Sequence, residues 1–239
     1  MSQKPYIPTV SPSSLSLFRS CRRCFYLDRR LRIARPDQKS FELQNAIDGL
    51  MKKEFDGYRE RGTAHPVMAG LPGDLIPYAD PRLDGWRTFG KSGLQTTHGP
   101  TGLRVYALVD DIWLSREDGS LRVVDYKTHG PDKPFDLQAG WGPNYQRQLE
   151  LYAWALMHHG DITAPISSTA HLVVAKPDRT APAFGGELRF DVEVLTHECD
   201  LSWFDGELAE VLACLESPVA PAPTRGCRFC AYVTDTAGV

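Results

Sequence analysis

The stretch VYALVDDIWLSREDGSLRVVDYKT, residues 105–128, is the part of the sequence that says most about the fold. Two apolar runs, 105–114 and 121–128, flank the segment SREDGS, which has Asp118-Gly119 near its centre. An Asp-Gly pair between two apolar runs is typical of a β-hairpin turn. The sequence therefore predicts a pair of adjacent strands here.

Three polar side chains of this hairpin, Asp110, Asp125 and Lys127, have the chemistry of a metal site. Residues two apart on a strand face the same side, so Asp125 and Lys127 project together, and the short turn can bring Asp110 beside them. With a backbone carbonyl such as that of Tyr126, two carboxylates make a hard oxygen site suited to Mg²⁺ or Mn²⁺. Such an ion polarises a phosphodiester and activates water, which Lys127 would orient. The alternative is a half-exposed hairpin with ordinary surface charges, although unpaired carboxylates are costly to bury in an apolar strand.

Helices and strands are predicted on both sides of the hairpin. Hydrophobic periodicity predicts helices over 11–33, 40–59, 143–159 and 200–216, and strands over 170–176 and 187–195. Ser11 with Pro12 is the expected start of the first helix, Gly160 the expected end of the third, and Asp200 the expected cap of the last. Residues 60–103 are rich in Gly and Pro and predict an irregular insertion. The order predicts one α/β domain over 1–239, with a mixed sheet flanked by helices.

The positive charge is concentrated near the N-terminus. The whole chain has a net charge of -3, but residues 19–35 contain seven arginines and one acid, Asp28. Such a patch can hold phosphates, although a solvated helix face has the same composition. The arginines that we expect to contact DNA are Arg19, Arg22, Arg23, Arg29 and Arg30.

The cysteines form two matching pairs at opposite ends of the chain. Of six cysteines, Cys21 and Cys24 form one Cys-x2-Cys pair, and Cys227 and Cys230 form the other. Brought together, four thiolates would hold zinc or an iron–sulfur cluster and join the terminal segments 11–35 and 220–239. The alternative is four unrelated thiols.

The hairpin resembles the central motifs of the PD-(D/E)XK nucleases, specifically the RecB-like branch. That branch also has Gln-x3-Tyr on the following helix, and this chain has Gln148 and Tyr152 one helical turn apart. The opening SPSSLSLFRSCRRCFYLDRRL, residues 11–31, is similar to the N-terminal segment of the same branch, which includes CRISPR-adaptation exonucleases. The resemblance implies a restriction-endonuclease-like fold, with Gln148 and Tyr152 contacting the site or the scissile strand.

The resemblance also implies ligands that differ from the usual family pattern. Asp48 stands where the branch has a metal-binding histidine, with Glu42 and Glu54 as other candidates on that helix, and Ala107 stands where a glycine is usual. Many members of the branch join their termini with a four-iron four-sulfur cluster, held by one N-terminal and three C-terminal cysteines. The two-and-two division in this chain leaves zinc open.

The sequence thus predicts a magnesium- or manganese-dependent deoxyribonuclease, with an exonuclease preference implied by the resemblance. DNA with a free or single-stranded end is the expected substrate. Two alternatives remain: a module that only binds nucleic acid, and a subunit active within a DNA repair or CRISPR-adaptation complex. The chain has no Walker A motif, no apolar signal core and no apolar run long enough to span a membrane, so we expect a cytoplasmic protein.

Overall fold

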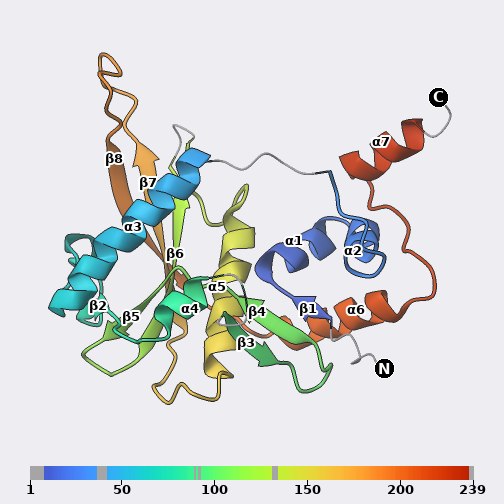
Figure 1. Cartoon of the computed structure of the whole chain (residues 1–239), viewed down its shortest axis with the longest axis horizontal. Helices are drawn as coiled ribbons and strands as arrows, with labels where there is room; N and C mark the ends of the chain where they lie inside the picture. The colour runs from blue at the N-terminus through green and yellow to red at the C-terminus, as the bar shows by residue number, and fades with distance from the viewer. Residues whose placement is uncertain (1–7, 37–41, 89, 91–92, 131–133, 237–239) are drawn as a thin grey trace. The chain divides into compact units, whose positions relative to one another are not determined.

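The computed structural model describes residues 8–36, 42–88, 90, 93–130 and 134–236 (Figure 1). The chain divides into two compact units. Unit 1 consists of 1–40, 95–106 and 202–239, and unit 2 of 41–94 and 107–201. The single domain over 1–239 stays a prediction.

Unit 2 is built on a five-stranded mixed sheet, which confirms the predicted fold class. The strands are β2 (Leu75–Pro77), β5 (Asp111–Ser115), β6 (Leu121–Thr128), β7 (Thr169–Pro177) and β8 (Phe190–Glu198), in the order β2-β5-β6-β7-β8. Only β6 and β7 run parallel; the other neighbours are antiparallel. The predicted hairpin is confirmed as β5 and β6, with Leu114 opposite Leu121 next to the turn.

Two helices of unit 2 supply residues on either side of β6. From α3 (Glu42–Arg61), Ile47, Met51 and Phe55 pack in one core cluster with Val124 and Tyr126. Because strand residues alternate between faces, Asp125 and Lys127 point away from that cluster. Helix α5 (Gly142–Met157) lies on their side, since its Gln148 contacts Asp125.

The two consecutive aspartates of the hairpin have different environments. The predicted strand 105–114 is interrupted: β4 (Arg104–Ala107) ends before Asp110, and β5 starts after it. Arg87, from α4 (Leu83–Arg87), donates to the Asp110 carbonyl at 2.7 Å, and this contact holds the backbone outside the ladder. Asp111 is fully buried, with its carboxylate bonded to Arg59, Arg87 and Tyr126, so burial is compensated by charge and hydrogen bonds.

Unit 1 contains four helices among its described residues. They are α1 (Pro12–Ser20), α2 (Arg22–Arg29), α6 (Phe204–Glu216) and α7 (Arg228–Thr236). Its small sheet has the order β1-β4-β3, with β1 (Thr9–Val10) parallel to β4. The Ser11 cap is confirmed and includes a reciprocal bond with Ser14. A single helix over 11–33 is wrong, because Cys21 is extended (φ −165°, ψ 107°) and separates α1 from α2.

Other boundaries also differ from the prediction. Residues 60–103 are not irregular throughout: they contain η1 (Pro66–Met68), β2, α4 and β3 (Leu94–Thr97). Helix α5 ends at Met157, before Gly160. The N-cap position of α6 is Trp203, which makes no side-chain capping bond, and not Asp200, whose amide donates to Glu150. Residues 40–41 of the predicted second helix lie outside the described residues. None of the described helices has the length and hydropathy needed to cross a membrane.

Candidate functional site

A polar pocket of about 360 Å³ opens in unit 2 between α3, α5 and the end of β6. All seven residues that the sequence predicts for the carboxylate site line this pocket: Asp48, Asp110, Asp125, Tyr126, Lys127, Gln148 and Tyr152. The fallback candidates Glu42 and Glu54 do not, and Glu54 bonds His65 instead. The local fold therefore brings the predicted set together.

Two carboxylates lie at the centre of the pocket. Asp125 is only 1% exposed; its Oδ1 accepts from Gln148 Nε2 at 2.9 Å, and its Oδ2 pairs with the Lys127 ammonium. Asp110 Oδ2 accepts from the backbone amide of Tyr126 at 2.9 Å. Asp110 is thus fixed beside β6 although it lies outside a strand.

The two carboxylates share their electrostatic environment. Burial and the neighbouring Asp110 raise the pKa of Asp125 to about 8, against the opposing charge of Lys127. Burial also acts on Asp110, but the charges of Lys127 and Lys52 prevail and lower its pKa. Of the two carboxyl groups, Asp125 therefore holds its proton more strongly than Asp110.

Gln148 connects α5 to the carboxylates. Its Nε2 donates to Asp125 and also to the Tyr152 hydroxyl, at 2.6 Å, one turn along the same helix. Burial and the two carboxylates raise the pKa of Tyr152 well above its usual value, which keeps the hydroxyl neutral. This chain of bonds orients the Asp125 oxygen toward the pocket.

Lys52 is a site residue that the sequence analysis missed. Its Nζ lies 2.8 Å from Asp48 Oδ2 and 2.8 Å from Asp110 Oδ1. Asp48 and Lys52 are four residues apart on α3, a spacing that is common in surface ion pairs and gives no sign of a site. Lys52 therefore connects the Asp48 carboxylate to the Asp110 carboxylate, which lies at the centre of the pocket.

The donors of the pocket fit a hard divalent cation. Three carboxylates and the Tyr126 carbonyl, which accepts from Lys127 Nζ at 3.3 Å, are oxygen ligands of the kind that Mg²⁺ and Mn²⁺ prefer. Within the part of the chain that the structure describes, however, no three of these carboxylates have oxygens all within 4.8 Å of one another. The three carboxylates therefore line one pocket without converging on a single point, and Lys52 contacts two of them.

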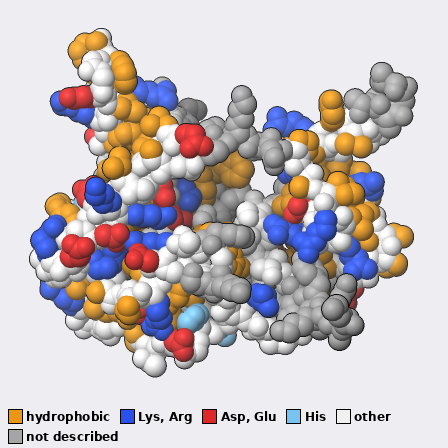
Figure 2. All heavy atoms as spheres, viewed as in Figure 1, with side chains coloured by type: hydrophobic (Ala, Val, Ile, Leu, Met, Phe, Trp, Pro, Cys, Tyr) orange, Lys and Arg blue, Asp and Glu red, His pale blue; other side chains and the backbone are white. Residues whose placement is uncertain are grey.

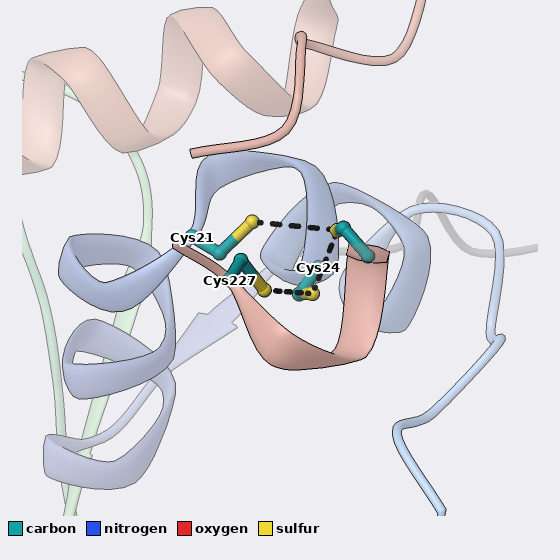
Figure 3. A group of neighbouring side chains, drawn as sticks. Cys21, Cys24 and Cys227 are labelled. Atoms are coloured by element: carbon teal, nitrogen blue, oxygen red, sulfur yellow. Dashed lines mark hydrogen bonds between the residues drawn. The ribbon is translucent and has the colours of Figure 1, made fainter. Parts of the chain in front are cut away.

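The four cysteines of the two Cys-x2-Cys pairs form a second centre, in unit 1 (Figure 3). Their sulfur atoms all lie within 4.8 Å of one another, and the described cysteines form no disulfide. Cys21 Sγ lies 3.8 Å from Cys230 Sγ, and Cys24 Sγ lies 3.6 Å from both Cys227 and Cys230. Four thiols at one point are a donor set for a thiophilic metal centre.

The pKa values of the Cys21, Cys24 and Cys230 thiols are shifted in different directions. Burial opposes ionisation of Cys21, but hydrogen bonds from the backbone of Thr224 and Cys24 prevail and lower its pKa to about 6. Burial raises the pKa of Cys24 and Cys230. The Arg35 guanidinium lies 3.8 Å from Cys227 Sγ. A bound cation would neutralise the thiolates that this arginine alone cannot balance.

The arginines expected to contact DNA have several intramolecular partners. Arg19 and Arg22 pair with Glu207 and Glu210 of α6, and Arg29 pairs with Asp28. Arg30 is exposed, and Arg23 lines an apolar pocket of about 680 Å³ together with Arg35 and Arg228. In unit 2, Figure 2 likewise shows Lys and Arg interspersed with Asp and Glu where α3 lies. Because Arg19, Arg22 and Arg29 each pair with an acidic side chain, the net positive charge of 19–35 is smaller at the surface than the sequence implies.

Comparison with models of protein families places the chain in a known superfamily. A family model described as the PD-(D/E)XK nuclease superfamily matches residues 61–234, well over half of the chain. The matched region contains Asp110 through Tyr152 as well as Cys227 and Cys230, whereas Asp48, Lys52 and the first cysteine pair precede it. A search of curated proteins finds no match.

Proposed function

Since the chain belongs to the PD-(D/E)XK nuclease superfamily, we propose that it is a divalent-metal-dependent deoxyribonuclease. The observation that carries this proposal is the joint placement of Asp110, Asp125 and Lys127 in one pocket, with Gln148 bonded to Asp125. A pocket of this size, with hard oxygen donors and a lysine, is suited to a phosphodiester and its counter-ion.

Each site residue has a role in this proposal. Asp48, Asp110, Asp125 and the Tyr126 carbonyl hold Mg²⁺ or Mn²⁺, which when bound supplies polarisation of the phosphate and activation of water. Lys127 orients the attacking water and stabilises developing negative charge. Gln148 and Tyr152 keep the Asp125 carboxylate in place.

We further propose that the substrate is DNA with a free or single-stranded end, cut as an exonuclease cuts. The arginines of 19–35, above all the exposed Arg30 and the pocket-lining Arg23, would contact phosphates. The resemblance of the sequence to the RecB-like branch supports this preference, and a partner in DNA repair or CRISPR adaptation is compatible with it. The cytoplasmic location stays a prediction from the sequence.

For the cysteine centre we propose a four-iron four-sulfur cluster, with zinc as the alternative. The tight grouping of four sulfurs supports either centre. Anaerobic purification followed by a visible spectrum and metal analysis separates the two: a broad absorbance with stoichiometric iron supports the cluster, and a colourless protein with one zinc supports the alternative.

The nuclease proposal is tested with end-labelled single- and double-stranded DNA in the presence of Mg²⁺ or Mn²⁺. Lys127→Met should lower the cleavage rate by at least about 100-fold. Lys176→Met is the matched control, because Lys176 pairs with Glu193 on the neighbouring strands and does not line the pocket. If the folded, metal-loaded protein does not cleave either DNA, the chain is not a nuclease on its own, and a binding module or an incomplete complex remains.

A further inference from the structure

We propose that Lys52 is an internal counter-ion that holds the acidic pocket in its metal-free form and competes directly with the divalent cation. This inference rests on the proposed nuclease site. Metal binding then requires the Lys52 ammonium to leave Asp110, so that this lysine sets the metal concentration at which the enzyme becomes loaded.

The position of the ammonium supports this competition. Lys52 Nζ bridges Asp48 Oδ2 and Asp110 Oδ1, each at 2.8 Å, and thus contacts two of the three carboxylates proposed as metal ligands. A cation bound by the same oxygens would lie beside the Lys52 ammonium, whose side chain is 21% exposed, and the two positive charges would repel each other. Repulsion of this kind is strong where water does not screen it.

The spread of the carboxylates is consistent with this role. The three acidic side chains of the pocket do not converge to within 4.8 Å as a group among the described residues, and Lys52 lies between two of them. Removal of the ammonium would let Asp48 and Asp110 approach one ion. Lys52 therefore separates ligands as well as neutralising them.

The two lysines of the pocket have different attachments. Lys127 is on β6, pairs with Asp125 and also donates to the Tyr126 carbonyl. Lys52 lies on α3, its side chain is 21% exposed, and the next residues along the helix, Lys53 and Glu54, are exposed. Lys52 can therefore move toward solvent without disturbing the sheet, and a bound phosphodiester would offer the released ammonium a new anionic partner.

Metal affinity measures this competition directly. Mn²⁺ binding is followed at pH 7 by the electron paramagnetic resonance of free Mn²⁺, on full-length protein with its cysteine centre loaded as purified. Asp110→Asn identifies the binding that belongs to the pocket. Lys52→Met, which keeps the aliphatic part of the side chain, should bind Mn²⁺ at least about tenfold more tightly than the unmodified protein.

Two variants control for charge and folding. Lys53→Met removes the same charge from the next, exposed position of α3 and should leave the affinity unchanged. Lys52→Gln keeps a donor for Asp110 without the charge and replaces Lys52→Met if the latter does not fold. Equal or weaker Mn²⁺ binding by a folded, uncharged Lys52 variant would overturn the proposal. That result would mean that the Lys52 ammonium does not compete with the cation and has a structural role alone.

A second measurement uses the unmodified protein. Amine-reactive labelling with mass spectrometry should show that Mg²⁺ increases modification of Lys52 and leaves that of Lys53 constant. Constant labelling of Lys52 despite metal binding contradicts displacement. Failure of every variant and of the unmodified protein to bind metal in this pocket has a different meaning, because it removes the proposed metal-dependent function itself.

Discussion

The carboxylate pocket of unit 2 takes its residues from one hairpin and two helices, whereas the cysteine centre of unit 1 joins Cys21 to Cys230 across 209 positions of the chain. In the pocket, Lys52 and Lys127 already balance the acidic side chains. At the cysteine centre, the Arg35 guanidinium contacts the sulfur of Cys227. We infer that the pocket folds before metal binds, while the cysteine centre depends on its metal to fold.

The largest expected effect concerns the cysteine centre. Cys24→Ser should abolish metal binding there and lower the hydrogen-exchange protection of α1, α2 and α7 at least about a thousandfold, because structural thiolate metals contribute roughly 10 kcal/mol or more to folding. The sheet of unit 2 should keep its protection. Hydrogen exchange with mass spectrometry measures both, and Cys199→Ser, outside the cluster, is the control. Unchanged protection of α7 in a metal-free variant would contradict the comparison.

The next effect separates the two neighbouring aspartates. Asp110→Asn should reduce cleavage about a thousandfold with little change in melting temperature, because it removes a metal ligand from a preformed pocket. Asp111→Asn should instead cost about 3 kcal/mol or more of stability, since it leaves Arg59 and Arg87 without their buried carboxylate. Cleavage assays and denaturant unfolding of both variants test this. A large stability loss in Asp110→Asn would mean that the pocket is not preformed.

A smaller effect is expected from pH. Because the pKa of Asp125 is raised to about 8, a divalent cation must displace its proton below that pH. Metal affinity of the pocket should therefore fall about tenfold for each unit between pH 8 and pH 6. Calorimetric titration with Mg²⁺ at several pH values, in two buffers of different ionisation enthalpy, measures the proton release. An affinity that is flat over this range would show that Asp125 is already ionised without metal.

The smallest effect concerns Gln148. Gln148→Met should lower the cleavage rate about tenfold, because Asp125 loses one oriented hydrogen bond while its metal-ligand oxygens remain. Gln146→Met is the control on the same helix, since Gln146 faces His197 instead. A loss as large as that of Lys127→Met would assign Gln148 a direct contact with the reacting groups.

The parts of the site that follow local rules were predictable from sequence. Asp125 and Lys127 share a face because strands alternate, and Gln148 meets Tyr152 because helices repeat every 3.6 residues. The hairpin turn followed from its Asp-Gly pair. These inferences needed no knowledge of distant contacts.

The parts that depend on distant partners were not predictable. The break at Asp110 depends on Arg87, and the break at Cys21 accompanies a cluster whose other half lies at the far end of the chain. Strand β2 has only three residues, ends in Pro77 and gains its regularity from pairing with β5. Lys52 resembled an ordinary helix ion pair, because its second partner, Asp110, comes from another element.

The buried Asp111 has a consequence for strand alignment during folding. A shift of β5 by one residue would turn every side chain of the strand to the opposite face. In one direction the shift would place Ile112 where Asp111 lies, and in the other it would place Asp110 there and Val109 at the position of Asp110. Only the native alignment supplies a carboxylate both to Arg59, Arg87 and Tyr126 and to the pocket. The first shift would deprive Arg59, Arg87 and the Tyr126 hydroxyl of their fully buried partner, and the second would leave the pocket without Asp110.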